Sequence, residues 1–320
     1  VKAMNYMFQG ATDFNKNISG WNTSLVTTMY AMFHSASSFD QPIGSWNVAN
    51  VKDLGYMFYN ASIFNRPLNA WITNSNTSLN ATFYGAKEFS YSLGSWNTSQ
   101  VTNMRYAFYG ASKFDHPLNT WNTSQVTNME YMFAGATIFK GDVTTWDTSK
   151  VTLMRHMFRS ASEFNQPIGS WNTSSVTDMS YMFQWATVFD KDISGWNTSN
   201  VIAMNQMFEL ATKFNQNINS WDVSKVTNMQ SMFQNADSFN MSIASWNVSN
   251  VTNLSYMFYG NDAFNQPLNS WVTSGATTMQ KMFQNSTKFN QNIKGWVVSQ
   301  VTNSTDFRTG SALTAINSPF

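Results

Sequence analysis

The sequence predicts an α/β solenoid built from 25-residue coils, and three observations support this prediction. The nonapeptide WNTSQVTNM occurs at residues 96–104 and again at 121–129. Twelve of the 13 tryptophans recur every 25 residues from Trp21 to Trp296, without an insertion or deletion. Two phenylalanine columns, which start at Phe8 and Phe14, share this period and hold 24 of the 26 phenylalanines. Such a period is typical of repeat proteins, in which each unit fills the same slot of a stacked core.

Each coil is expected to contain a short strand, a turn, a short helix and a second turn. Residues 18–23 alternate in polarity and follow a column that holds five of the six prolines, as at the start of a strand. From Val26 the apolar spacing becomes three and four residues, which predicts a helix with Thr27 as its N-cap. Gly, Asn or Ser recurs two residues after the Phe8 column, where this helix would end in a left-handed residue. Together these elements form one coil of a right-handed solenoid.

The period divides the chain into twelve repeats over residues 1–300 and a degenerate terminal repeat or C-terminal cap at residues 301–320. In this last segment Ser304 replaces the usual Met and Arg308 replaces the usual Phe. At the other end, Phe8 and Phe14 carry the intact core pattern. Either further upstream sequence covers them, or they form an end-stacking surface for another copy. A head-to-tail contact of the second kind would propagate into a filament.

One further observation links the chain to a known repeat. The motif W-[ND]-[TV]-S-x-V-T-[ND]-M-x-x-M-F-x-x-A-x-x-F-[ND]-Q-P-[IL] is nearly complete in residues 146–168. It is similar to the BspA-like surface repeat, also called DUF285, a variant of the leucine-rich repeat. The resemblance covers essentially the whole chain. It implies a leucine-rich-repeat-like solenoid that is extracellular or attached to the cell surface, with an adhesive role toward cell-surface or matrix glycans and proteins.

Composition excludes several other classes of protein. Charged residues make up only 11%, and 18 Lys+Arg against 17 Asp+Glu leave a net charge of +1. No basic run could follow a phosphate backbone, so we expect no nucleic-acid partner. There is no run of 18 apolar residues, so no membrane span is expected. Cysteine is absent, which excludes disulfides and thiolate metal sites.

The polar residues do not suggest an enzyme. The three histidines, His34, His116 and His156, occupy three different columns, and the scattered carboxylates form no repeated pair. Phosphate-loop and metalloprotease motifs are also missing. We therefore predict no catalytic residue, no metal site and no cofactor.

N-glycosylation sequons are the most frequent motif in the chain. Six of the 15 lie directly after a tryptophan, which predicts a rod coated with glycans on one face. The structural alternative is that a chain rich in Asn, Ser and Thr forms sequons by accident, while stacked Asn side chains stabilise the solenoid. The sequons begin at Asn17, Asn22, Asn60, Asn76, Asn80, Asn97, Asn122, Asn172, Asn197, Asn240, Asn247, Asn250, Asn253, Asn285 and Asn303.

The leading hypothesis is thus a non-enzymatic extracellular structural or adhesive solenoid, glycosylated and assembling head to tail. A second hypothesis is a carbohydrate- or protein-binding module, with Tyr59, Tyr84 and Tyr109 lining one recognition face. Trp185, the only tryptophan out of register, and Leu210 one coil later would form a separate apolar partner patch.

A third hypothesis is ice binding by a regular surface row of threonines. This row would consist of Thr23, Thr73, Thr98, Thr123, Thr148, Thr173, Thr198 and Thr273.

Overall fold

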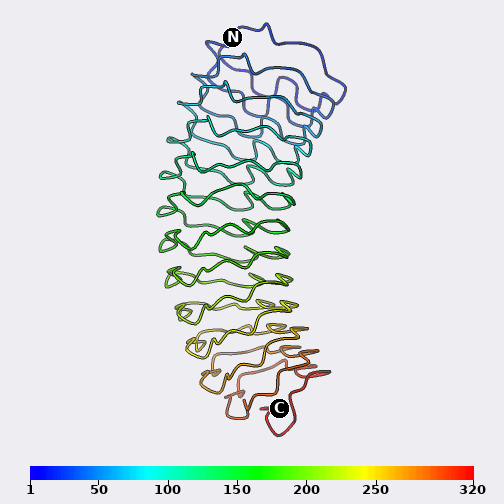
Figure 1. Cartoon of the computed structure of the whole chain (residues 1–320), viewed down its shortest axis with the longest axis vertical. Coiled ribbons are helices and arrows are strands. Elements are labelled where there is room, and N and C mark those ends of the chain that lie inside the picture. Colours follow the sequence, from blue (N-terminus) through cyan, green and yellow to red (C-terminus); the bar gives the residue numbers. More distant parts are fainter. The chain divides into compact units, whose positions relative to one another are not determined.

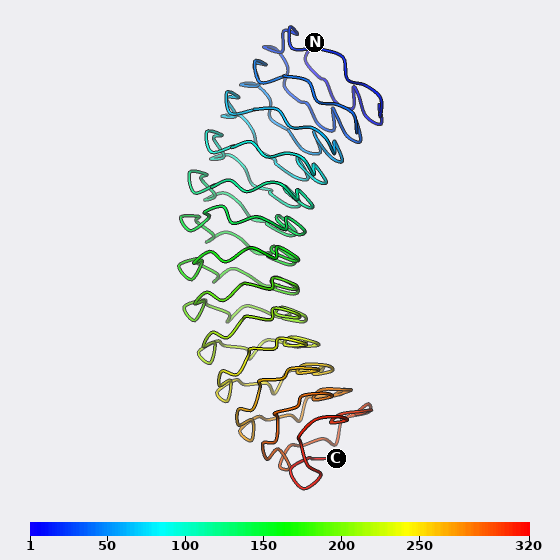
Figure 2. The same ribbon diagram turned by 45° about the vertical axis from the view of Figure 1, so that its right-hand side comes forward.

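A computed structural model describes residues 1–320. The chain forms two compact units: Val1–Val151 with Met157–Gln166 (unit 1), and Thr152–His156 with Pro167–Phe320 (unit 2). In each unit the backbone winds through successive stacked coils, which Figures 1 and 2 show from two directions. The coils contain neither an α-helix nor an extended strand, and so no helix that could cross a membrane.

Isolated parallel bridges join residues that are 25 positions apart. In unit 1 the bridges connect Ala3, Thr28, Asp53, Ser78, Asn103 and Asn128 in turn. In unit 2 they connect Leu153, Asp178, Ala203, Asn228, Asn253, Thr278 and Asn303. Each coil therefore contributes one residue to a ladder that runs from coil to coil, and residues 25 apart form what we call a column.

The predicted helix is wrong, because alternate amides leave the coil. The Met32 amide donates to Met29 O at 3.1 Å, and the Ala36 amide to Phe33 O at 3.0 Å, as in four-residue turns. The Phe33 and Ser35 amides, which alternate with these, donate to Met57 O at 2.9 Å and Tyr59 O at 2.6 Å in the next coil. An α-helix would instead return each amide to the carbonyl four residues earlier. Thr27 is consequently no N-cap.

Left-handed residues explain why this segment forms turns. Two residues per coil have positive φ, in the columns that start at Tyr6 (φ 58°) and Gly10 (φ 69°). The first column contains no glycine, and 20 of these residues in the chain are not glycine. A left-handed residue costs about 1–2 kcal/mol when it carries a Cβ, so the surrounding contacts must hold it in place. The predicted left-handed conformation in the Gly10 column is present, although it does not end a helix.

The predicted strand at residues 18–23 is also wrong. The Trp21 amide donates to Ile18 O at 3.1 Å, which closes a turn rather than extending the chain. The α/β class with strand and helix in each coil is therefore replaced by a solenoid of turns and bridges.

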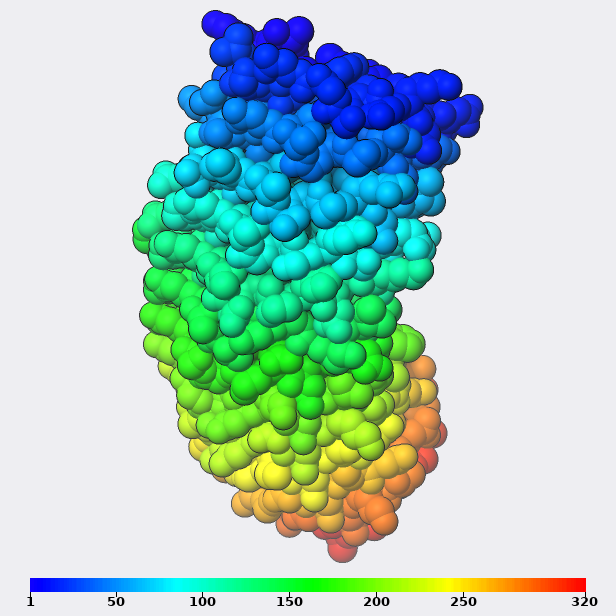
Figure 3. Space-filling view, turned by 45° about the horizontal axis from the view of Figure 1, so that its top comes forward, coloured from blue at the N-terminus to red at the C-terminus, as the bar shows by residue number.

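The core consists of stacked aromatic columns. Phe33 and Phe39 stack within one coil at a centroid distance of 3.8 Å, and Phe33 stacks on Phe58 of the next coil at 5.9 Å. These side chains are fully buried. Figure 3 shows the resulting close packing of successive coils, for example in the blue-to-cyan part of the chain. Phe8 and Phe14, which have a neighbouring coil on one side only, are half-buried, so complete burial of each phenylalanine requires a coil on both sides.

The tryptophan column adds a hydrogen bond between coils. Its indole Nε1 donates to the carbonyl 28 residues earlier, at distances such as 2.9 Å from Trp121 to Leu93 O. The same bond is made by Trp46, Trp71, Trp96, Trp146, Trp196, Trp221, Trp246, Trp271 and Trp296. Trp21, in the first coil of the sequence, is 38% exposed.

Three asparagines in the Gly10 column pack against a glycine of the following coil. A Cβ built on Gly85 would collide with Asn60 Oδ1. The same collision occurs between Gly260 and Asn235, and between Gly310 and Asn285. The asparagine side chain therefore occupies the space that a side chain of the next coil would need.

An Asx turn follows the tryptophan in most coils. The Asn97 Oδ1 accepts the Ser99 amide at 2.9 Å, and the Asp147 Oδ1 accepts the Ser149 amide at 2.9 Å. The same turn begins at Asn22, Asn47, Asn122, Asn172, Asn197, Asp222 and Asn247. The need for a side-chain oxygen that accepts this backbone amide therefore explains why the position is Asn or Asp in most coils.

The residues of the degenerate segment 301–320 pack at the end of unit 2. The Phe320 ring meets the Phe307 ring edge to face at 4.9 Å, and Leu313 is buried. The Ile293 amide donates to Asn317 O at 2.9 Å. This segment thus contacts the preceding coil although it lacks the core pattern.

The indole hydrogen bonds can be tested with Trp121→Phe. We expect a loss of about 2–3 kcal/mol in unfolding free energy, because both the bond to Leu93 O and buried aromatic surface are lost. Trp21→Phe is the matched control and should cost much less. Denaturant unfolding of both variants measures the difference, and equal losses would show that the bond contributes nothing.

The Asx turns predict a pH dependence of stability. Hydrogen bonds from the Ser149 hydroxyl and amide hold the pKa of Asp147 below its usual value, and Ser224 lowers the pKa of Asp222 in the same way. A lowered folded-state pKa contributes stability above the unfolded pKa, and this contribution is lost as pH falls through the folded pKa. The Asp147→Asn/Asp222→Asn variant keeps both acceptors.

We therefore expect the melting temperature of this double variant to fall less than that of the parent between about pH 5 and pH 2. Thermal melts across that range provide the measurement. Parallel pH profiles would contradict a role for these two carboxylates.

Candidate functional site: a tyrosine surface

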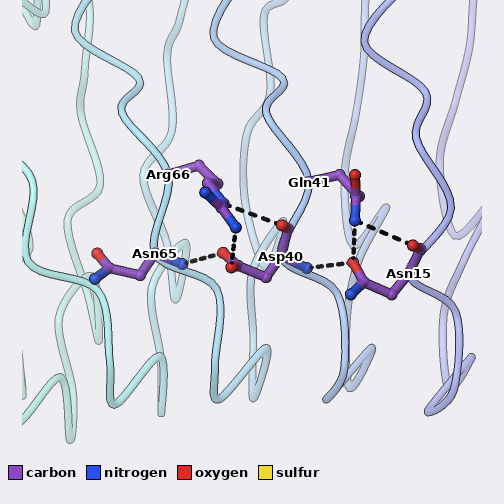
Figure 4. A network of polar contacts seen from close by, with 5 residues as sticks. All are labelled: Asn15, Asp40, Gln41, Asn65 and Arg66. Atoms are coloured by element: carbon purple, nitrogen blue, oxygen red, sulfur yellow. Dashed lines mark hydrogen bonds and ion pairs between the residues drawn. The ribbon is translucent and has the colours of Figure 1, made fainter.

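Many polar side chains connect neighbouring coils. Figure 4 shows Asn15 Oδ1 accepting the Asp40 amide and Asp40 Oδ1 accepting the Asn65 amide, at 3.0 and 2.9 Å. Gln41 Nε2 donates back to Asn15 Oδ1 at 2.8 Å, and Arg66 pairs with the Asp40 carboxylate at 2.6 Å. The side-chain oxygens of Asn15 and Asp40 are thus used between coils.

The sequons lie at very different depths. Asn76 is buried, with 1% exposure, in a column that holds valine at every other position except Ala276. Asn80, Asn240, Asn253 and Asn303 are half-buried. The exposed sequon residues are Asn17, Asn22, Asn60, Asn97, Asn122, Asn172, Asn197, Asn247, Asn250 and Asn285. The six after tryptophan make the Asx turn described above, which gives their recurrence a structural cause.

The threonine row expected at the surface is buried, so the ice-binding hypothesis is wrong. Thr23, Thr73, Thr98, Thr123, Thr148, Thr173, Thr198 and Thr273 are at most 2% exposed. Their hydroxyls point to the next coil; Thr98 Oγ1, for example, donates to Asn122 O at 2.9 Å. Ice binding by this row would need exposed hydroxyls and methyls, whereas these side chains join coils.

The three histidines lie in separate structural settings. His34 stacks on Tyr59 at 4.4 Å, and His116 Nε2 lies 2.6 Å from Ser90 O. His156 is buried and stacks on Tyr181 at 4.1 Å. No group of three potential metal ligands is present.

Trp185 and Leu210 occupy the left-handed column of adjacent coils in unit 2, with φ of 63° and 58°. The Trp185 side chain is 48% exposed and Leu210 is half-buried. Beside them, Glu209 is 9% exposed, and its Oε2 accepts bonds from Gln184 at 2.6 Å and Gln206 at 2.7 Å. The structure thus places the two predicted patch residues next to each other.

A tyrosine surface in unit 1 is the main feature that the coil pattern does not require. Tyr59, Tyr84 and Tyr109 come from consecutive coils and stack face to face, with centroids 4.2 and 4.4 Å apart. Beside them a second column contributes Tyr56, Tyr106 and Tyr131, whose last two rings stack at 4.6 Å. All six side chains are half-buried. We call these six residues the tyrosine surface.

The tyrosine surface surrounds a hollow of about 320 Å³, with Ala81 as its seventh lining residue. No charged side chain lines this hollow. Burial and the neighbouring Tyr59 and Tyr109 raise the pKa of Tyr84 far above its usual value. Its phenol therefore remains protonated and can donate a hydrogen bond as well as accept one.

The sequence indicated half of this surface. Tyr59, Tyr84 and Tyr109 were expected to share a face, and the structure places them together. Tyr56, Tyr106 and Tyr131 were missed because they belong to the left-handed column, which resembled the middle of a helix. The recurrence of tyrosine at that column was the available signal.

Comparison with solved structures gives only distant similarity. A leucine-rich repeat protein from Eubacterium ventriosum has 12% identity and a TM-score of 0.35, covering 91% of this chain and 82% of that one. The TLR13 chain of a complex with ssRNA13 has 9% identity and a TM-score of 0.28, covering 92% and 50%. The mouse RP105 and MD-1 complex gives 9% and 0.27, covering 80% and 48%. The chain spans about half the length of these last two structures.

Comparison at the level of sequence identifies the repeat itself. No curated protein matches the chain. A family profile described as "Mycoplasma protein of unknown function, DUF285" matches residues 1–93, 71–152, 139–234 and 216–317. Because these four matches together extend from residue 1 to residue 317, this chain belongs to the DUF285 family.

Proposed function

We propose that this protein is a non-enzymatic structural and adhesive solenoid, extracellular or held at the cell surface, which binds its partner through the tyrosine surface. The observation that carries the proposal is the gathering of six half-buried tyrosines around one hollow. Other recurrent polar groups, such as Asn15, Thr98 and Asn97, already bond to backbone within the solenoid. The tyrosines belong neither to the buried core nor to the rows of hydrogen bonds between coils. A binding role would explain why they gather at one place.

Tyrosine suits such a role. Its ring supplies a large contact area at a small cost in conformational entropy, and its hydroxyl both donates and accepts. Burial raises the pKa of the Tyr84 phenol, which disfavours acid–base chemistry by this group and favours recognition. Aromatic residues are also enriched at the centres of protein interfaces.

The remaining parts of the proposal concern modification and assembly. In a host that glycosylates sequons, the ten exposed asparagines would carry glycans and buried Asn76 would not. Half-buried Phe8 and Phe14 would form an end-stacking contact with another coil, beside the exposed Trp21. The division into twelve repeats over residues 1–300 and a terminal segment at 301–320, and a second partner patch at Trp185 and Leu210, belong to the same proposal.

The binding role can be tested with the triple variant Tyr59→Ala/Tyr84→Ala/Tyr109→Ala. We expect at least a ~10-fold loss of binding to arrayed glycans and to cultured cell monolayers, because the stacked rings form one wall of the hollow. Labelled protein and fluorescence detection provide the measurement. The matched control is Tyr256→Ala/Tyr259→Ala, a tyrosine pair of unit 2 with centroids 5.9 Å apart. Equal binding by the parent, the triple variant and the control would contradict a binding role for the tyrosine surface.

Assembly and glycan content can be measured by sedimentation velocity over a hundredfold dilution, with carbohydrate mass determined by refractometry. The proposal predicts a large species that resists dilution and contains carbohydrate. Phe8→Asp should reduce it to monomers, since a charge in a stacked aromatic contact is strongly unfavourable. A bare monomer of 36.3 kDa would remove both the filament and the glycans from the proposal.

A further inference from the structure

The hollow in the tyrosine surface exists because one ring is missing. In the left-handed column, Tyr56 and Tyr106 lie two coils apart, and the coil between them carries Ala81. A tyrosine at position 81 would stand between these two rings, as Tyr131 stands one coil beyond Tyr106 at 4.6 Å. Ala81 instead forms the floor of the hollow and is 1% exposed.

A second coil also lacks a tyrosine in this column, but there a neighbouring side chain occupies the space. Ala31 lies between Tyr6 and Tyr56 in the same column. The preceding residue, Tyr30, places its ring between them, 5.4 Å from Tyr6 and 5.3 Å from Tyr56. At the corresponding place before Ala81 the residue is Asn80, which has no ring. The slot at Ala81 is therefore open, whereas the one at Ala31 is closed by the protein itself.

The size and chemistry of this slot limit what could enter. Its volume of about 320 Å³ is at the lower end of the range for small-molecule sites. Six phenols and one methyl group line it, without any charge. Aromatic faces contact apolar C–H surfaces, and each phenol hydroxyl can donate and accept one or more hydrogen bonds.

We propose that the Ala81 slot binds one pyranose ring of a neutral glycan. This inference rests on the proposed function and names the ligand of its binding surface. A pyranose has C–H faces for the flanking rings and a rim of hydroxyls for the phenols. An aromatic side chain of a peptide would leave those hydroxyls without a partner. Arg105 lies 4.7 Å from the Tyr106 ring centroid but is paired with Glu130 at 3.2 Å, so a charged sugar would find no free counter-charge there.

Ala81→Tyr is the direct test. Position 81 already has the backbone conformation of the tyrosines in its column, with φ of 53° against 57° at Tyr56 and 58° at Tyr106. The variant should therefore fold, which circular dichroism and the melting temperature would verify. Asn80→Tyr is the second filling variant, because it copies the arrangement of Tyr30 and Ala31. Ala81→Gly leaves the slot open and serves as the matched control.

Saturation-transfer NMR would measure binding of methyl β-glucoside, methyl β-galactoside, methyl glucuronide and N-acetyl-tyrosinamide. We expect at least one neutral glycoside to bind the parent and Ala81→Gly, with a ~10-fold or greater loss in both filling variants. Binding of no neutral glycoside, unchanged binding in the filling variants, or preference for the glucuronide or tyrosinamide would each overturn the inference.

Adhesion measured in parallel separates this inference from the function on which it rests. If the filling variants still bind cells and arrayed glycans while the triple tyrosine variant does not, the surface recognises a partner without using the slot. If the triple variant also binds normally, the proposed function fails as well.

Discussion

The structure depends on amides that donate along the stack instead of within the coil. The residues in the Tyr6 and Gly10 columns take left-handed conformations, which direct their amides toward carbonyls of the next coil. Those bonds require each coil to have the same length and path as its neighbour, since a shift of one residue would pair the wrong groups. The unbroken period of 25 residues follows from this constraint, as do the columns of Phe, Trp and Thr that fill the space between coils.

The same constraint organises the surface. Because equivalent residues lie directly over one another, any side-chain type that recurs at one position produces a continuous row. Asn15, Asp40 and Asn65 form a polar row in this way, and Tyr59, Tyr84 and Tyr109 an aromatic one. The binding site that we propose combines such a row with one residue that differs from the rest. Ala81 is the exception in the tyrosine surface.

The period and the core columns could be predicted from sequence because large apolar residues recur without error. The local conformation could not. Spacings such as Val26, Met29, Met32 and Phe33 are those of an amphipathic helix, and the feature that excludes a helix is a left-handed residue at Ala31. Glycine would have signalled it, but this column holds Tyr, Ala, His, Gln, Ser, Lys and Asp. Tertiary contacts overrule the local preference of these residues.

Two errors about sites have the same origin. Thr98 and its equivalents were placed on the surface because a strand was assumed there, whereas the turn directs them toward the next coil. Tyr56 and Tyr106 were overlooked because their column was assigned to the middle of a helix. In both cases the sequence shows which residue type recurs, but the direction of its side chain depends on turns that the sequence pattern does not indicate.

The contact between an asparagine and the glycine of the following coil has a consequence for how this gene can change. Tandem repeats expand and contract by unequal recombination, which copies or removes whole units. Here the order of units matters, because a unit with Asn60, Asn235 or Asn285 is followed by one with glycine at the same position. Duplicating the first member of such a pair would place the Cβ of a second Asn against the Oδ1 of the first, so that the first side chain would have to shift. Recombination that copies or removes both members of a pair would leave this contact intact.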